Sequence, residues 1–277
     1  MSYFEVLALF IGPPLLVLAL LAWRDGRSKP VAAWGVLAGR AYWAVLLHVA
    51  IAVAYTTPWD NYLVATGVWW YDPALVTGIT VGWVPIEEYT FFVVQTLMSG
   101  LLLLALMRYA FKRSGVLKPS LRLRWGASVA AGIVWLAGVM LLVSGWDKGT
   151  YLGLILGWAT IPIVTQLAFG ADILWARRRL VAVGIALPSV YLWIADAVAI
   201  QSGTWTIDPA QSTGVLLAGI LPVEEAVFFT VTNLLVVFGM VLMLAPESQT
   251  RTRDLLAKLR RREMQQPRTW TQQHDEI

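Results

Sequence analysis

The sequence predicts an all-α, polytopic membrane protein with seven transmembrane helices, built as two parallel three-helix repeats joined by a linker helix. Three observations support this prediction. Of the 277 residues, 58% are hydrophobic and 14% are charged, whereas about 25% of the residues of a soluble domain are charged. Apolar segments of membrane-spanning length recur along the chain. A short acidic motif also occurs twice.

Seven apolar segments are long enough to cross a bilayer. The first has neither a basic start nor a small-residue cleavage site, so we expect it to be retained as a helix and not removed as an export signal. The spans are expected near residues 3–23, 37–57, 85–108, 125–144, 150–169, 180–200 and 222–245.

The positive charges predict the orientation. Of the 21 Lys and Arg residues, all but Lys148 fall in the loops or the tail on one side of the expected helices. Because positively charged loops remain in the cytoplasm, we expect a multi-pass protein of the plasma membrane with its N-terminus outside and its C-terminus inside. The basic tail is expected either to lie on anionic lipid or to be solvated. Charges confined to loops do not indicate a nucleic-acid partner.

The composition excludes several kinds of chemistry. The chain has no Cys, which rules out disulfides, thiolate metal centres, iron–sulfur clusters and Cys nucleophiles. It has two His residues, His48 and His274, too few for a zinc site built on several imidazoles. We therefore expect no metal site. His48 is expected to be a hydrogen-bonded interior residue of the second span.

An internal duplication is visible in the acidic motif. The segment P-I-E-E-Y-T-F-F, which begins at Pro85, returns as P-V-E-E-A-V-F-F at Pro222, 137 positions later. The shared pattern is P-x-E-E-x-x-F-F. Internal repeats of this kind indicate copies of one structural unit.

Two further landmarks agree with this offset within one residue. Asp72-Pro73 returns as Asp208-Pro209, and Asp60 returns as Asp196, each 136 positions later. A single linker crossing restores the direction of the chain after three helices, so both repeats are expected to have the same orientation in the membrane. The expected units are a first repeat at 1–111, a linker with the fourth helix at 112–149, a second repeat at 150–246 and a basic cytoplasmic tail at 247–277.

Four glutamic acids are placed in or at the edge of lipid, where ionisable residues usually face a cavity or the interior of a helix bundle. No Lys or Arg inside a span can neutralise them, so burial and mutual repulsion are expected to keep at least one acid of each pair protonated. A protonated acid can donate its proton. A structural role, in which the acids bind neighbouring helices, is the alternative. These residues are Glu87, Glu88, Glu224 and Glu225.

The prolines before the glutamate pairs allow two predictions for the depth of these acids in the membrane. Pro85 and Pro222 are expected either to begin the last helix of each repeat or to kink it. The acids would lie in a first turn in one case and deeper in the membrane in the other. Asp72 and Asp208 each precede a proline, a pattern that favours a helix start at the outer face.

Aromatic residues accompany the acids. Neighbouring residues on a helix point about 100° apart, so Glu87 and Glu88 are not expected to address the same atom, whereas each shares a face with a Phe one turn further on. An acid beside aromatic rings suits protonation of an apolar alkene and stabilisation of a carbocation. Ordinary packing, or an interfacial belt for the Trp residues, is the alternative. The candidate substrate-binding residues are Phe91, Phe92, Phe228, Phe229, Trp59, Trp70, Trp83, Trp205, Asp72 and Asp208.

At these residues the sequence resembles the membrane-integral lycopene cyclases, which are not flavoproteins and occur as paired subunits or as fused tandem domains. The likeness runs from about Leu37 to Ala245. The second copy departs from the pattern at Ala195-Asp196-Ala197, where the Trp and Asn of the first copy are missing. The matching pieces are Pro58-Trp59-Asp60-Asn61-Tyr62, the segment from Trp70 to Pro73, and both P-x-E-E motifs.

The resemblance implies a lycopene beta-cyclase of carotenoid biosynthesis, a redox-neutral isomerase. It would protonate the acyclic end group of lycopene, close an ionone ring and lose a proton, giving beta-carotene or gamma-carotene. The expected partners are lycopene or a similar carotenoid, membrane lipid, and a second copy or other carotenoid enzymes. The flavoprotein cyclases require G-x-G-x-x-G after a strand, a motif that the sequence lacks, so we expect no cofactor. The expected catalytic residues are the four glutamic acids, with Asp60 and Asp196 as proton partners or anchors.

Other functions fit part of the pattern. A retinal-binding pump needs a Lys in the last span, and none of the five lysines lies in a span. A proton-coupled transporter also combines parallel repeats with intramembrane carboxylates, but its path should carry more polar groups than Gln95, Gln166 and Asn233. A hydratase or a C50 carotenoid cyclase would form the same cation, and both remain alternatives.

Overall fold

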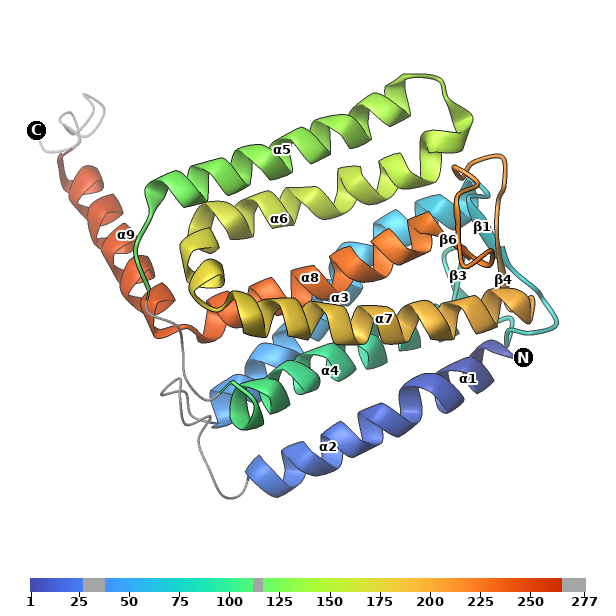
Figure 1. Cartoon of the computed structure of the whole chain (residues 1–277), viewed down its shortest axis with the longest axis horizontal. Helices are drawn as coiled ribbons and strands as arrows, with labels where there is room; N and C mark the ends of the chain where they lie inside the picture. Colours follow the sequence, from blue (N-terminus) through green and yellow to red (C-terminus); the bar gives the residue numbers. More distant parts are fainter. Residues whose placement is uncertain (27–37, 112–116, 266–277) are drawn as a thin grey trace, which may run out of the picture.

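The computed structural model describes residues 1–26, 38–111 and 117–265. Within this part, seven helices are long and apolar enough to cross a membrane, which confirms the all-α fold class and the expected number of spans. The chain is a multi-pass membrane protein. Figure 1 shows the N-terminus and the short strands at one end of the bundle, here named the strand end, and α9 at the other, the tail end. Arg27, Lys29, Lys112, Arg113 and the tail from residue 266, with His274, lie outside the described residues.

The helices follow the expected order. The first span is continuous from Tyr3 to Gly26 and contains a short π-helical segment. The elements are α1 (Tyr3–Val6), η1 (Leu7–Ile11), α2 (Gly12–Gly26), α3 (Ala38–Ala65), α4 (Ile86–Tyr109), α5 (Leu121–Val143), η2 (Asp147–Gly149), α6 (Thr150–Ala176), α7 (Arg178–Gln201), α8 (Val223–Leu244) and α9 (Pro246–Gln265).

The second span extends further than expected. The apolar segment predicted an end near residue 57, but α3 continues through Pro58 to Ala65. Trp59, Asp60 and Leu63 lie beyond the proline and are buried. Their packing holds this last part of the helix in place.

Short strands at the strand end were not expected from the sequence. Strand β1 (Trp69–Tyr71) pairs antiparallel with β4 (Trp205–Ile207) and so joins two distant parts of the chain. Two small hairpins lead into α4 and α8. Their strands are β2 (Thr80–Val81), β3 (Val84–Pro85), β5 (Leu216–Leu217) and β6 (Leu221–Pro222).

The Asp-Pro pairs do not begin helices, so that expectation is wrong. The carboxylate of Asp72 accepts a hydrogen bond of 2.9 Å from the backbone N–H of Ala74, and that of Asp208 accepts one of 2.9 Å from Ala210. Asp favours such local turns for the same reason that it caps helices. Here the chain leaves the turn toward a hairpin.

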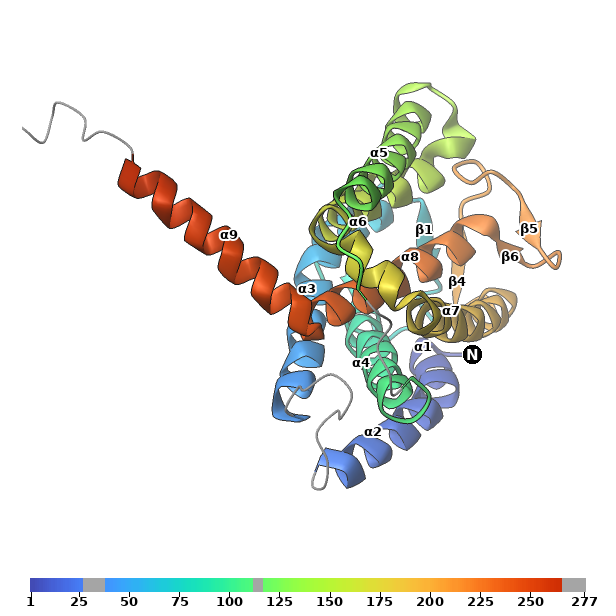
Figure 2. The same ribbon diagram turned by 60° about the vertical axis from the view of Figure 1, so that its left-hand side comes forward.

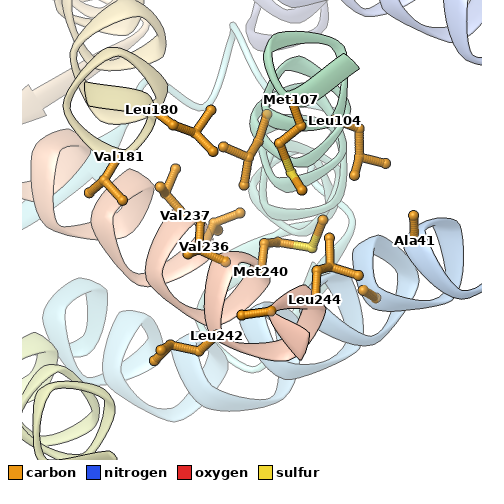
Figure 3. Packing of buried hydrophobic residues seen from close by; sticks show 14 of the residues in the cluster. Ala41, Leu104, Met107, Leu180, Val181, Val236, Val237, Met240, Leu242 and Leu244 are labelled. Carbon is orange, nitrogen blue, oxygen red and sulfur yellow. The ribbon is translucent and has the colours of Figure 1, made fainter. Parts of the chain in front are cut away.

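An apolar cluster holds the tail end together. Side chains of α4, α7 and α8 meet there, with Met107 and Leu180 facing Val237 and Met240 (Figure 3). Helices in lipid associate mainly through close packing of this kind. Helix α5 packs on α6 outside this cluster, where Gly138 lies against Leu156 so closely that an added Cβ would be 2.7 Å from that of the leucine.

Helix α9 leaves the bundle and projects away from it (Figure 2). Its first turns are tied to α6 and to the start of α7 by ion pairs. Arg251 contacts Asp172 at 2.8 Å, and Glu247 contacts Arg177 at 2.7 Å. The described part of the basic tail is therefore a helix anchored at its beginning.

Candidate active site

The glutamate pairs lie in the first turns of α4 and α8. Pro85 and Pro222 are the residues directly before these helices, so the prolines begin the helices and do not kink them. Acidic groups are favoured in a first turn because the free N–H groups and the helix dipole attract negative charge. All four carboxyl side chains are nevertheless buried, with exposed fractions of 8% or less: Glu87, Glu88, Glu224 and Glu225.

The first glutamate of each pair accepts a hydrogen bond from the backbone of a loop. Glu87 accepts a hydrogen bond of 2.6 Å from the backbone N–H of Thr77, and Glu224 accepts one of 2.7 Å from Thr213. Each threonine precedes a glycine with a positive φ, Gly78 or Gly214, and few other residues adopt that conformation. These two acids therefore fasten the hairpins to the helix starts.

The second glutamate of the first pair points elsewhere, as the 100° turn between neighbours predicts. Oε2 of Glu88 accepts hydrogen bonds from the hydroxyl groups of Tyr3 and of Tyr71, the latter at 3.0 Å. Burial, followed by the charges of Glu88 and Asp60, raises the pKa of Tyr71 well above its usual value. The phenol of Tyr71 therefore stays protonated at neutral pH and can keep donating its hydrogen bond.

The second pair has a matching arrangement. The hydroxyl group of Tyr151 donates a hydrogen bond of 2.5 Å to Oε1 of Glu225. The backbone N–H of Tyr151 bonds to the carbonyl oxygen of Gln211, as that of Tyr3 bonds to Leu75. Both tyrosines thus stand at the start of a bundle helix, fixed to a loop at the strand end. The sequence analysis did not find either of them.

Acids from both halves of the chain line one cavity. This space, here named the acid cavity, has a volume of about 50 Å³ and lies between α1, η1, α4, α7 and α8 at the strand end. Glu88 and Glu225 both face it, together with Asp196. Its other lining residues include Tyr3, Tyr71, Trp69, Trp205, Phe91, Phe228 and Phe229.

The two aspartates differ in their partners. Oδ1 of Asp196 accepts a hydrogen bond of 3.0 Å from the indole N–H of Trp205. Asp60 is 1% exposed, and neither of its carboxyl oxygens has a hydrogen-bond partner in the described part of the chain. The two halves are therefore similar without being identical.

Aromatic rings form the wall behind the acids. Trp59 stacks on Phe228 at a centroid distance of 5.6 Å and on Trp158 at 4.5 Å. Phe91 meets Phe229 edge to face at 6.0 Å. Ring faces attract cations, and the effect is stronger where water is excluded.

Six of the ten residues expected at the substrate do not line the acid cavity: Trp59, Trp70, Trp83, Phe92, Asp72 and Asp208. Trp70 and Trp83 are 45% and 68% exposed, and the backbone N–H of Trp83 bonds to Asn61. Asp72 and Asp208 make the turns described above. The four expected substrate-binding residues that do line the acid cavity are Phe91, Phe228, Phe229 and Trp205. In residues 1–26, 38–111 and 117–265, no three His, Asp or Glu side chains are grouped to hold a metal ion.

These features define an integral membrane protein whose buried acids face an aromatic cavity near one end of a helical bundle. The family model described as lycopene cyclase matches residues 3–110 and 147–243. The chain therefore belongs to the lycopene cyclase family.

Similar proteins carry names that agree with membership of this family. The chain is 38% identical over 243 residues to a lycopene beta-cyclase of Halobacterium salinarum. This alignment covers 87% of this chain and 95% of the relative. It is 39% identical over 207 residues to a bifunctional lycopene cyclase/phytoene synthase of Phaeosphaeria nodorum, covering 70% of this chain and 34% of that longer protein. A search of the solved structures gives no match.

Proposed function

We propose that this protein is a lycopene beta-cyclase that converts the acyclic end group of lycopene into a beta-ionone ring inside the membrane. The observation that carries the proposal is the acid cavity, in which Glu88 and Glu225 face one aromatic-lined space. The name of the Halobacterium relative supports the choice of the beta ring.

The reaction needs one proton donor and one proton acceptor. A carboxylic acid adds its proton to the terminal carbon–carbon double bond, which leaves a tertiary cation. The neighbouring double bond attacks this cation, closes the six-membered ring and moves the positive charge into the ring. A carboxylate then removes a ring proton and forms the final double bond. One proton enters and one leaves, so the product is an isomer of the substrate and no electrons are transferred.

The hydrogen bonds favour a division of labour between the two acids. Glu88 accepts two phenolic hydrogen bonds on one oxygen, and donors of this kind stabilise a carboxylate. Glu225 accepts one such bond in the described part of the chain. We therefore assign proton donation to Glu225 and proton removal to Glu88, with Asp196 as a neighbouring proton partner.

The remaining acids receive other roles. Glu87 and Glu224 bind N–H groups of the loops that precede the hairpins, so we assign them to positioning the helix starts. Asp60 is near enough to Tyr71 to raise the pKa of its hydroxyl group, and we assign it to the charge balance around Glu88. Phe91, Phe228 and Phe229 would shield the cation.

The proposal includes the division of the chain and its place in the cell. The repeats would be residues 1–111 and 150–246, with 112–149 as linker and 247–277 as basic tail. The positive charges support a plasma-membrane protein with the N-terminus outside and the C-terminus inside. Membrane lipid and a second copy of the chain are the proposed further partners.

Expression in a lycopene-accumulating host tests the proposal. Chromatography of the pigments is expected to show beta-carotene, or gamma-carotene if one end reacts. A hydroxylated acyclic product would instead indicate a hydratase. Unchanged lycopene, with the protein shown to be in the membrane, would contradict the proposal and favour a transporter.

A further inference from the structure

A second pocket lies further from the strand end than the acid cavity. It is bounded by α3, α4, α6 and α8 and has a volume of about 190 Å³. Most of its wall is apolar or aromatic. The residues that line it are His48, Ile51, Ala52, Tyr55, Thr56, Phe91, Phe92, Gln95, Thr96, Trp158, Pro162, Gln166, Phe228, Thr232, Leu235 and Val236.

The phenylalanines of the duplicated motif separate this pocket from the acid cavity. Phe91 and Phe228 line both spaces, whereas Phe92 lines only the second pocket and Phe229 only the acid cavity. Phe228 and Phe229 are 5.3 Å apart, and Phe91 is 6.0 Å from Phe229. The two spaces therefore share the side chains of Phe91 and Phe228 as part of their walls.

The pocket is elongated along the bundle. On α3 it reaches from Thr56 to His48 and on α6 from Trp158 to Gln166, a separation of eight positions in each case, or about 12 Å of helix. At its end nearest the acid cavity, the hydroxyl group of Tyr55 bonds to the carbonyl oxygen of Trp158 at 2.9 Å. Ile51 lines the pocket and is 51% exposed, so the space opens sideways toward lipid.

The far end of the pocket is polar and tightly packed. The imidazole of His48, whose Nδ1 lies 2.7 Å from the carbonyl oxygen of Ala44, rests on Gly239 so closely that a side chain there would overlap it. The side-chain amide of Gln166 donates a hydrogen bond of 3.0 Å to the carbonyl oxygen of Leu235. These groups close the end of the pocket that is farther from the acid cavity.

On the basis of the proposed function, we infer that this pocket binds the polyene chain of the substrate while one end group occupies the acid cavity. The acid cavity alone has a volume of about 50 Å³, whereas a cavity that binds a single benzene ring has a volume of about 150 Å³, so the cavity is too small for an end group. Phe91 and Phe228 must therefore swing aside when the end group enters, and the adjoining pocket is the space that continues from them. Its apolar length and its opening to lipid suit a hydrocarbon that arrives through the bilayer.

A pair of substitutions on one helix tests the inference. Ala52→Phe places a ring inside the pocket, whereas Ala54→Phe makes the same change at an exposed position of α3 outside it. Two measurements are made on each detergent-purified protein. One is the binding of lycopene, followed by its absorption spectrum. The other is the rate of ring closure with lycopene and with a short acyclic analogue that carries the same end group but lacks most of the polyene.

We expect Ala52→Phe to weaken lycopene binding and to lower kcat/KM for lycopene at least tenfold, with the rate for the short analogue within twofold of wild type. Ala54→Phe should match wild type in lycopene binding and in the rates with both substrates. Equal loss for both substrates, or lycopene binding unchanged by Ala52→Phe because a lipid chain alone fills the pocket, would overturn the inference. A third outcome is that wild-type protein binds lycopene, Ala52→Phe weakens this binding, and no ring is closed. This outcome would support the pocket and contradict the proposed function. Wild-type protein that binds no lycopene would overturn the inference.

Discussion

The hydroxyl group of Tyr151 donates a 2.5 Å hydrogen bond to Glu225 across a separation of 74 residues. Tyr3 makes the matching contact to Glu88 across 85 residues. Each bond ties the start of one helix to an acid in the first turn of another. The cavity acids are thus held by helices remote in the sequence, which fixes the direction in which each carboxyl group points.

Removal of these hydroxyl groups should have unequal effects. Tyr151→Phe leaves Glu225 without a phenolic donor in the described structure, whereas after Tyr3→Phe the carboxyl group of Glu88 keeps its bond to Tyr71. Glu225 becomes a carboxylate as it gives up its proton, and a hydrogen bond to a charged group contributes about 1.5–3 kcal/mol. We expect Tyr151→Phe to lower the rate of ring closure roughly ten- to a hundredfold and Tyr3→Phe to lower it less. Rates in lycopene-loaded membranes measure this, and a larger effect of Tyr3→Phe would contradict the arrangement.

The acids that face the hairpins should matter for stability more than for chemistry. Glu224→Ala leaves the N–H group of Thr213 without its partner and should destabilise the protein by about 1–3 kcal/mol. Glu224→Gln keeps an oxygen acceptor and should stay within a few-fold of wild type in both stability and rate. Thermal unfolding in detergent and the cyclisation rate check both variants. An inactive but stable Glu224→Gln protein would show that this acid transfers protons.

A glycine in the loop before the first hairpin gives a test of backbone conformation. Gly78 has a φ of 76°, and Ala in this region costs about 1–2 kcal/mol. Gly78→Ala should therefore lower the unfolding temperature. Gly126→Ala, in α5 with open space around it, should leave that temperature unchanged or raise it, because Ala is favoured over Gly inside a helix by about 0.5–1 kcal/mol. The reverse order of unfolding temperatures would contradict the described loop.

The ion pair between α9 and α6 should anchor the tail helix. The Asp172 side chain is 1% exposed and lies 2.8 Å from Arg251, and removal of one partner of a buried pair costs about 3–5 kcal/mol. We expect Arg251→Gln to release α9 and speed its cleavage by trypsin. Adding Asp172→Asn should restore part of the protection, since the unpaired charge is then gone. Cleavage at the wild-type rate in Arg251→Gln would contradict this role, and ring closure at the distant acid cavity should be unaffected.

The sequence was sufficient to predict the membrane-spanning helices and to identify the duplicated acids. Hydropathy identified all seven helices because lipid demands about twenty apolar residues for each crossing. Strands of two or three residues carry too little periodicity to be recognised, so the pairing of β1 with β4 was not expected. Helix α3 continues past Pro58 because tertiary packing outweighs the missing hydrogen bond.

The tyrosine partners could not be found from the repeat offset. Tyr3 and Tyr151 are 148 positions apart, whereas Glu88 and Glu225 are 137 apart. Asp60 and Asp196 keep an offset of 136, so the additional residues of the first repeat lie between Tyr3 and Asp60. Because the two repeats differ in length there, a fixed offset does not align the two tyrosines.

Glu88 and Glu225, which come from the two halves of the chain, are proposed to act together on one end group in one cavity. The decisive measurement is ring closure by Glu88→Gln and by Glu225→Gln, each beside Glu87→Gln in membranes with equal amounts of protein. Because loss of a general acid or base lowers the rate by about a hundred- to ten-thousandfold, we expect each of the first two variants to keep less than about 1% of wild-type activity. If instead each kept about half of the activity, and only the double variant were inactive, each half would have its own active site and the claim would be wrong.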